Sequence, residues 1–432
     1  MENGISLTKV FCVRSYEEAH DIETSREMFS IKSMVLRGFI ILWVFIANRL
    51  LSLLKWILFS NFKPNKNHVD NLVVYTTGVL GDNVLMLPAI AGIKKGYPET
   101  KLTVIVNCDR FSENPVKEIF EDLPYVDKLI TLSDHPVKRE GFKIIVDAPT
   151  VEGVNCNLFI NLSPFGNRGW IGAVVREMLF ARWLNAKWAV GFKMNTYSRR
   201  NIFNKVQHHF IENEARRPRE ILSEIGLKPI EGEDLLPIDQ HAKSMVKGKI
   251  SKFLPEKRFV AVLNPGAKLK ASQWPPKRFG EVSQWLAKEY EACVLLNGNE
   301  SEKSICDEVV EASEGVAINL AGLSVRELIE LLRISDLLIT NNTGPMTLAA
   351  MIGVPMVVIS STRFSPTFYI PISERMIWLF SFHEKSYSYK DEGGPSEDLL
   401  NIQVSDVSNA LKELIPSKTE GVLLANERIL AV

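Results

Sequence analysis

Cysteine is scarce in this chain of 432 residues, and its five copies are scattered. They are Cys12, Cys108, Cys156, Cys293 and Cys306, and no two of them have C-x-x-C spacing. The pattern argues against a zinc knuckle and fits a reducing compartment. We therefore expect these thiols to be inert side chains of the core or the surface.

An excess of charge of one sign is also missing, because Lys plus Arg and Asp plus Glu number 51 each. Such a balance creates no overall field that would attract nucleic acid, so only local asymmetry is informative. No repeat with a period of about 20 to 50 residues is present, which excludes a solenoid. Residues 1–30 lack the apolar core of a signal peptide, so we expect no export signal there.

Long hydrophobic runs are absent except at about residues 35–59, where Leu, Ile, Val, Phe and Trp dominate. The run exceeds the roughly 20 residues that a bilayer span needs. About one third of its helical wheel holds the polar residues Arg37, Asn48, Arg49, Ser52 and Lys55. We favour an interfacial helix on an anionic membrane surface. A true span, which Arg49 makes costly, and a helix packed on the protein's own surface remain open.

After a linker at 61–71, short apolar strands alternate with helical stretches. A strand at 72–75, a turn at 78–82, a helix at 83–95 and a strand at 101–106 form a β-loop-α-β unit, which requires a parallel sheet. Further strands are expected at 127–131, 143–147 and 157–161. A second series runs from a strand at 259–263 to one at 356–360.

This alternation predicts an α/β fold of two Rossmann-like, doubly wound domains that face a ligand cleft. Residues 1–61 form an N-terminal extension with the membrane-associating helix. The two domains cover 62–240 and 241–415, and 416–432 form a tail.

The first turn, Gly78-Val79-Leu80-Gly81-Asp82, disfavours a dinucleotide-binding oxidoreductase. It lacks the third glycine of G-x-G-x-x-G and places a carboxylate where a pyrophosphate would lie. Asp82 instead suits either helix capping or a general base at the end of the first strand.

Residues 336–355 place a helix N-terminus directly after a buried strand. Asn342 is the expected N-cap, Gly344 lets a ligand approach the backbone, and Pro345 suits the first helical turn. The free N–H groups of such a turn favour a phosphate or another anion. An ordinary helix cap is the alternative.

A local excess of positive charge lies at residues 165–210. The cations are Arg168, Arg176, Arg182, Lys187, Lys193, Arg199, Arg200 and Lys205, interleaved with Trp170, Phe180, Trp183, Trp188, Phe192 and Tyr197. The only acid is Glu177. Such a surface attracts anions and fits an amphipathic partner, so Arg168, Arg199 and Arg200 are candidates for binding an anionic glycolipid acceptor. A solvated helix face over core aromatics is the alternative, and no recognised motif supports a nucleic-acid site.

Three stretches together resemble glycosyltransferase family 9. They are Gly81-Asp82 with the helix that follows, Asn264-Pro265-Gly266 leading to Trp274-Pro275, and 319–322 with Asn342-Thr343-Gly344-Pro345. The similarity covers about residues 70–370 in the right order. That family includes the ADP-heptose lipopolysaccharide heptosyltransferases. The resemblance implies a GT-B fold, a nucleotide-sugar donor on the C-terminal domain, an acceptor on the N-terminal domain, and inversion at the anomeric carbon without a metal or another cofactor.

By position, the resemblance implies that Asp82 is the catalytic base, that Gly81 lies on the acceptor side, and that Glu300 holds the ribose hydroxyls. The expected donor-binding residues are Gly266, Lys268, Lys270, Glu300, Leu320, Gly322, Asn342, Thr343, Gly344, Pro345 and Thr347. Three positions depart from the family pattern, since Asn342 replaces an Asp, Thr347 a His and Ser272 a Lys. Lys268 and Lys270 could neutralise the leaving diphosphate instead. Consistent with the absence of a metal, the sequence has no Asp-x-Asp motif and no histidine cluster.

The resulting hypothesis is an inverting, metal-independent glycosyltransferase. It moves a heptose-like or other sugar from a nucleotide-diphosphate sugar to a membrane-associated glycan or glycolipid of the lipopolysaccharide or cell-surface polysaccharide type. We expect it in the cytoplasm, attached peripherally or monotopically to the inner face of the cytoplasmic membrane. A GT-B epimerase or hydrolase, which consumes donor without an acceptor, and a non-catalytic nucleotide-binding module remain alternatives.

Overall fold

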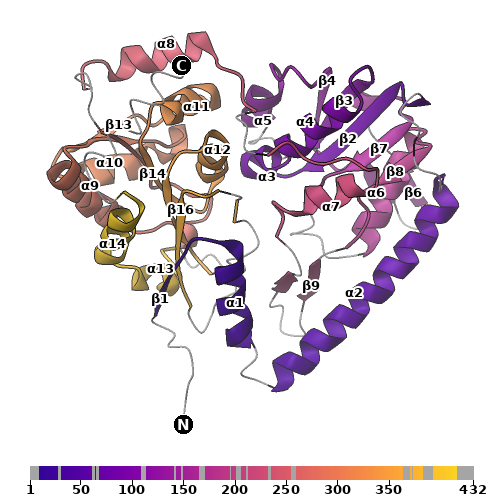
Figure 1. Cartoon of the computed structure of the whole chain (residues 1–432), viewed down its shortest axis with the longest axis horizontal. Helices are drawn as coiled ribbons and strands as arrows, with labels where there is room; N and C mark the ends of the chain where they lie inside the picture. Colours follow the sequence, from indigo (N-terminus) through magenta and orange to yellow (C-terminus); the bar gives the residue numbers. More distant parts are fainter. Residues whose placement is uncertain are drawn as a thin grey trace. The chain divides into compact units, whose positions relative to one another are not determined.

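The computed structural model of the chain forms two compact units, divided after Arg26 and before Leu236. We call residues 27–235 the N-terminal unit, and the residues before 27 and after 235 the C-terminal unit (Figure 1). The described residues are 9–27, 31–60, 64, 68–108, 113–140, 143–146, 149–164, 171–194, 196–200, 206–210, 213–231, 235–253, 259–362, 370–371, 373–382 and 393–415.

The N-terminal unit is built on a five-stranded parallel sheet with the order β4-β3-β2-β7-β8. Its strands are β2 (Asn71–Thr77), β3 (Lys101–Asn107), β4 (Lys128–Leu132), β7 (Leu158–Asn161) and β8 (Trp188–Val190). Its helices are α2 (Ile31–Leu58), α3 (Leu80–Val84), α4 (Leu87–Gly96), α5 (Glu113–Phe120), α6 (Ile171–Trp183) and α7 (Arg217–Ser223), with a 3-10 turn η2 (Pro149–Val151). β2 and β7 bury side chains on both faces, as central strands of a parallel sheet do.

Two antiparallel hairpins complete this unit. They are β5 (Val137–Glu140) with β6 (Lys143–Val146), and β9 (Thr196–Arg200) with β10 (Val206–Phe210). The strand expected at 143–147 therefore forms outside the parallel sheet, because it pairs with its immediate neighbour along the chain. The single helix expected at 83–95 is divided into α3 and α4.

Aromatic rings in stacked and edge-to-face contact fill the core of the N-terminal unit. The centroid of Phe159 lies 6.0 Å from that of Tyr75, 6.1 Å from that of Phe180 and 6.2 Å from that of Phe192. Phe59, just after α2, stacks on Phe192 at 6.1 Å. Such pairs add to the free energy gained by burying the rings, and they draw the end of α2 into the core.

One side of α2 belongs to the same core. Val44, Ala47 and Leu51 are buried in it, at the three- and four-residue spacing of one helix face. Within the part of the chain that the structure describes, no helix is long and apolar enough to cross a membrane.

Polar side chains of α2 also face the protein. Asn48 donates to the Met194 carbonyl at 3.0 Å and accepts from the Met194 N–H at 2.7 Å. Lys55 forms an ion pair with Glu224 at 2.8 Å. Part of the polar third of the wheel is thus turned toward the N-terminal unit itself, which the periodicity alone did not indicate.

The C-terminal unit is built on a seven-stranded sheet with the order β1-β16-β15-β14-β11-β12-β13, parallel except for β1. Its strands are β1 (Val10–Val13), β11 (Val260–Asn264), β12 (Cys293–Leu296), β13 (Ala317–Asn319), β14 (Leu337–Asn341), β15 (Met356–Ser360) and β16 (Met376–Ser381).

The helices of this unit complete the alternating pattern. They are α1 (Tyr16–Glu27), α8 (Gln240–Ile250), α9 (Pro276–Tyr290), α10 (Lys303–Ala312), α11 (Val325–Arg333), α12 (Gly344–Ile352), α13 (Glu397–Asn401) and α14 (Val404–Leu414), with 3-10 turns η3 (Lys270–Ser272) and η4 (Glu300–Glu302). α11 shows why the sequence begins a helix there. Ser324 accepts from the Glu327 N–H at 3.1 Å while the Glu327 carboxylate accepts from the Ser324 N–H at 2.9 Å, which is a complete capping box.

The edge strand β1 comes from the start of the chain and pairs antiparallel with β16. Phe11 stacks on Phe380 at 5.4 Å. This strand lies within the expected N-terminal extension, residues 1–61, where the sequence pattern predicts no strand.

Candidate functional site

Asp82 follows the carboxyl end of β2, in the short helix α3. Its Oδ2 accepts from the Val79 N–H at 2.9 Å, so the carboxylate caps the turn. Gly78 has φ +114°, and a Cβ at this position would lie only 2.2 Å from Asp82 Oδ2. The turn therefore requires glycine there, both for its backbone conformation and for the close approach of the carboxylate.

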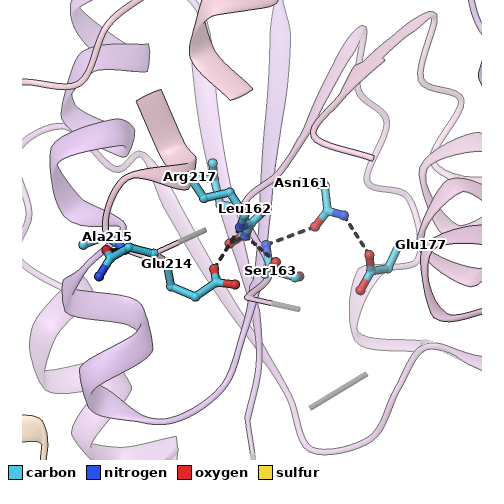
Figure 2. A network of polar contacts seen from close by, with 8 residues as sticks. Asn161, Leu162, Ser163, Glu177, Glu214, Ala215 and Arg217 are labelled. Carbon is cyan, nitrogen blue, oxygen red and sulfur yellow. Dashed lines mark hydrogen bonds and ion pairs between the residues drawn. The ribbon is translucent and has the colours of Figure 1, made fainter. Parts of the chain in front are cut away.

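A buried polar network stands beside this turn, at the carboxyl end of β7 (Figure 2). Asn161 pairs with Tyr75 of β2 in the sheet register. Its side chain donates to Glu177 Oε2 at 2.7 Å and accepts from the Ser163 N–H at 3.1 Å. The acid that the sequence placed in the basic region is thus buried, where it holds Asn161, and it is not part of the exposed basic surface.

Arg217 binds the other side of the same chain segment. Its guanidinium pairs with Glu214 at 2.8 Å and donates to the carbonyls of Leu162, at 2.7 Å, and Ser163 (Figure 2). Arg217 and Glu214 are both buried. Since the Leu162 N–H also donates to the Tyr75 carbonyl at 2.8 Å, the backbone next to the end of β2 is fixed from three directions.

The acceptor candidates are described only in part. Gly81 lies in α3 directly before Asp82. Arg199 and Arg200 lie on β9, where the backbone alone is described, and Arg168 lies outside the described residues. Of the interleaved aromatics, Phe180, Trp188 and Phe192 are buried core residues, whereas Trp183 is exposed.

In the C-terminal unit, Asn264 and Asn341 end two neighbouring buried strands and Asn297 directly follows a third, and the three form a clamp. Asn297 donates to Asn264 Oδ1 at 2.8 Å. Asn341 donates to the Pro265 carbonyl at 2.8 Å and accepts from the Trp274 N–H at 3.0 Å. The clamp fixes the loop that carries Gly266, one of the expected donor-binding residues.

The N-terminus of α12 lies at the same edge of the sheet. The helix begins at Gly344, and its N-cap is Thr343, so the prediction of Asn342 as N-cap is wrong. Asn342 instead donates to Ser360 Oγ at 3.3 Å, because the next strand offers a side-chain acceptor. Pro345 occupies the first turn as expected.

Two threonine hydroxyls form hydrogen bonds at the start of α12. Thr343 Oγ1 accepts from Asn264 Nδ2 at 3.3 Å, which joins the helix start to the asparagine clamp. Thr347 is buried, and its hydroxyl donates to the Gly344 carbonyl at 2.8 Å. In this arrangement Thr347 stabilises the first turn of α12.

Glu300 and Gly322 meet at the ends of β12 and β13. Gly322 has φ +96°, and a Cβ there would lie 2.6 Å from Glu300 Oε2. The Gly322 N–H donates to the Gly298 carbonyl at 2.9 Å, and the Leu320 N–H donates to the Leu296 carbonyl at 3.0 Å. The carboxylate is otherwise exposed and lies 3.9 Å from Lys303, so it is accessible to a ligand.

Glu302, a half-buried acid at this edge, was not identified from the sequence. Its Oε2 accepts from the Asn299 N–H at 2.9 Å, and a Cβ at Gly266 would lie 2.1 Å from its Oε1. Burial raises the pKa of Glu302, and the Asn299 N–H opposes that shift. The signal was present in the sequence, because Asn299 and Glu302 have the spacing of a capping box.

The remaining residues expected to bind the sugar donor are two lysines. Lys268 and Lys270 are exposed, the first in the loop after Gly266 and the second in η3. Among the described residues, no group of three His, Cys, Asp or Glu side chains could hold a metal ion.

The structure thus collects the expected donor-binding residues at the carboxyl edge of one parallel sheet. It places Asp82 at the carboxyl edge of another, where ligands of open α/β sheets bind. The asparagine clamp was not identified from the sequence, because three isolated asparagines become one network only through the strand order.

Comparison with known proteins agrees with this architecture. The profile described as "Glycosyltransferase family 9 (heptosyltransferase)" matches residues 179–397, about half of the chain. Lipopolysaccharide heptosyltransferase 3 of Escherichia coli is 23% identical over 360 residues, which covers 80% of this chain and 99% of that protein.

Two solved structures share the fold. The glycosyl transferase of family 9 from Veillonella parvula has a TM-score of 0.59 at 21% identity, with 80% of this chain and 97% of that one covered. The ADP-heptose lipopolysaccharide heptosyltransferase II of E. coli has a TM-score of 0.55 at 17% identity, with 80% and 98% covered. These likenesses establish an α/β fold with parallel sheets of the GT-B heptosyltransferase type. The chain belongs to glycosyltransferase family 9 and is a heptosyltransferase-like glycosyltransferase.

Proposed function

We propose that the protein transfers a heptose-like sugar, with inversion and without a metal or another cofactor, from a nucleotide-diphosphate sugar to a membrane-associated glycolipid of the lipopolysaccharide or cell-surface polysaccharide type. The observation that carries the proposal is the position of Asp82 beside a rigid strand end in a chain of this family. The names of its relatives support lipopolysaccharide as the acceptor class and ADP-heptose as the first donor to test.

The donor lies on the C-terminal unit in this proposal. The Glu300 carboxylate accepts hydrogen bonds from the two ribose hydroxyls, for which its exposed position over Gly322 is suitable. The diphosphate lies at the start of α12, where backbone N–H groups and the helix dipole favour anions. Lys268 and Lys270 add positive charge as the leaving group develops negative charge.

The acceptor lies on the N-terminal unit. Asp82 removes the proton of an acceptor hydroxyl while that oxygen attacks the anomeric carbon from the face opposite the nucleotide. The bond from that carbon to the diphosphate oxygen breaks in the same step, and its electron pair leaves with the diphosphate. Inversion follows from this single displacement.

Transfer to a membrane-associated acceptor also requires the enzyme to lie at the membrane surface. We propose a cytoplasmic protein attached peripherally or monotopically to the inner face of the cytoplasmic membrane. The apolar helix α2 and the basic β9–β10 hairpin in the same unit support this placement.

The test combines nucleotide binding with transfer. Wild type and Asp82→Asn are titrated with ADP, UDP, GDP and CMP, and then assayed with ADP-heptose and a lipopolysaccharide-core glycolipid. We expect Asp82→Asn to lower turnover by about 10² to 10⁴ and to leave nucleotide affinity unchanged.

Asp70→Asn, an exposed acid at the other end of β2, is the matched control and keeps full activity. Donor consumption without acceptor would identify an epimerase or hydrolase. Nucleotide binding without any turnover would identify a binding module. Either result would contradict the proposal.

A further inference from the structure

Helix α2 exposes a broad apolar face that is opposite to its buried side. Eight large hydrophobic residues on this outer face are between 43% and 64% exposed. They are Leu42, Trp43, Phe45, Ile46, Leu50, Leu53, Trp56 and Ile57. These are half of the sixteen exposed large hydrophobic residues of the described chain, so the exposure is concentrated on one helix.

The anchoring of α2 prevents this face from turning inward. Asn48 makes two hydrogen bonds to Met194, and Lys55 pairs with Glu224 on the opposite side of the helix. A rotation of the helix about its own axis would break all three contacts. The outer face is therefore a fixed surface of the N-terminal unit.

The surroundings of the outer face are positively charged. Arg49 lies on it, with its guanidinium 5.0 Å from the centre of the Phe45 ring. The Lys187 carbonyl accepts from the Ser60 N–H at 2.8 Å, which places this exposed cation beside the end of α2. α6, which packs along α2, ends in the exposed Arg182 and Trp183.

The sequence around the helix contains no compensating acid. Residues 28–69 include six lysines and arginines and not one Asp or Glu. A second copy of this face could therefore not pair with Arg49, whereas anionic lipid headgroups could. Trp43 and Trp56 suit the same environment, because indole rings favour the boundary between headgroups and acyl chains.

We propose that the outer face of α2 docks flat in one leaflet of a bilayer that contains anionic lipids, and so fixes the orientation of the N-terminal unit on the membrane. The polar inner face excludes a span, because Asn48 and Lys55 are already bound to the protein. The inference deepens the proposed function by assigning its membrane-contacting surface, and it rests on that function only for the presence of a membrane acceptor.

The test is co-sedimentation of the full chain with vesicles of phosphatidylcholine alone and of an equal mixture with phosphatidylglycerol. The variant Leu53→Ser, Trp56→Ser, Ile57→Ser removes apolar groups that contact water, so its thermal stability should equal that of wild type. We expect its partition coefficient on the mixed vesicles to fall at least about tenfold. Arg49→Gln should weaken binding about fivefold, on the anionic vesicles only and less at high salt.

The matched control is Ile238→Ser, Met245→Ser, which removes two similarly exposed apolar residues, 46% and 45%, from the C-terminal unit. It should bind vesicles like wild type. Wild type that stays in the supernatant with every vesicle would overturn the proposal. The proposal would also be overturned if light scattering showed a wild-type dimer that becomes a monomer in the α2 variant, because the face would then be a dimer interface. Membrane-bound protein that resists alkaline extraction would overturn it too, because the helix would then span the bilayer. ADP binding, measured without vesicles, is unchanged in the α2 variant, so a failure of docking and a failure of the proposed transfer are seen separately.

Discussion

The buried ion pair between Arg217 and Glu214 gives a prediction whose size follows from its surroundings. The two side chains are 4% and 0% exposed, with Nε and Oε2 2.8 Å apart. The Arg217→Met variant keeps most of the volume but leaves the Glu214 carboxylate, and the carbonyls of Leu162 and Ser163, without these donors. Breaking a buried pair in this way costs about 3 to 5 kcal/mol. For a unit of this size, that lowers the midpoint of thermal unfolding by about 6 to 20 °C.

The same helix supplies the control. Arg219 pairs with Glu231 at 2.5 Å, but the side chains are 65% and 41% exposed. Exposed pairs contribute about 0 to 1 kcal/mol, so Arg219→Met should shift the midpoint by no more than about 4 °C. Differential scanning calorimetry of both variants measures the difference. Adding Glu214→Gln to Arg217→Met removes the stranded charge and should recover part of the loss. Equal shifts for Arg217→Met and Arg219→Met would refute the reasoning.

Two further predictions concern the C-terminal unit. Gly322→Ala should displace Glu300 and weaken ADP binding in calorimetric titration by about tenfold, the size of one lost charge-assisted hydrogen bond. Gly315→Ala is the control: Gly315 has φ +79° and open space around it, so alanine there imposes similar backbone strain and should keep the affinity for ADP. Equal affinity of both variants for ADP would remove Glu300 from the site. Desolvation raises the pKa of Glu302 above its usual value, so the folded state binds this proton more tightly than the unfolded chain does. Wild type should therefore lose stability relative to Glu302→Gln as the pH rises through the raised pKa. Denaturant unfolding at several pH values measures this, with Glu308→Gln, an exposed acid of α10, as control; a pH-independent difference would contradict it.

The sequence predicted the strands that are buried on both sides, because β2, β11 and β14 are short apolar runs bounded by turn residues. It also placed the expected donor-binding residues at loops that the structure brings to one edge. It did not predict β5 and β6 as a separate hairpin, since residue composition alone does not choose between a local and a distant pairing partner.

The other differences between the predictions from the sequence and the structure arise from contacts between residues that are far apart in the chain. A helical wheel locates the polar stripe of α2, but it cannot show that Met194 and Glu224 offer partners to Asn48 and Lys55. In the same way, Asn342 has the properties of an N-cap, and only the neighbouring strand reveals that Ser360 binds it. β1 is four residues long, too short to be distinguished from a loop by pattern.

That short strand affects how the protein can be made. β1 supplies the outer edge of a sheet whose other strands are encoded hundreds of residues later, and the whole N-terminal unit lies between them in the chain. During synthesis the first strand must wait for β16 before it finds its partner, so the C-terminal unit is completed last. A fragment that begins at residue 236 would leave β16 as a bare edge and expose Phe380, which invites intermolecular strand pairing. The C-terminal unit is therefore not a module that can be cut out of the chain at residue 236.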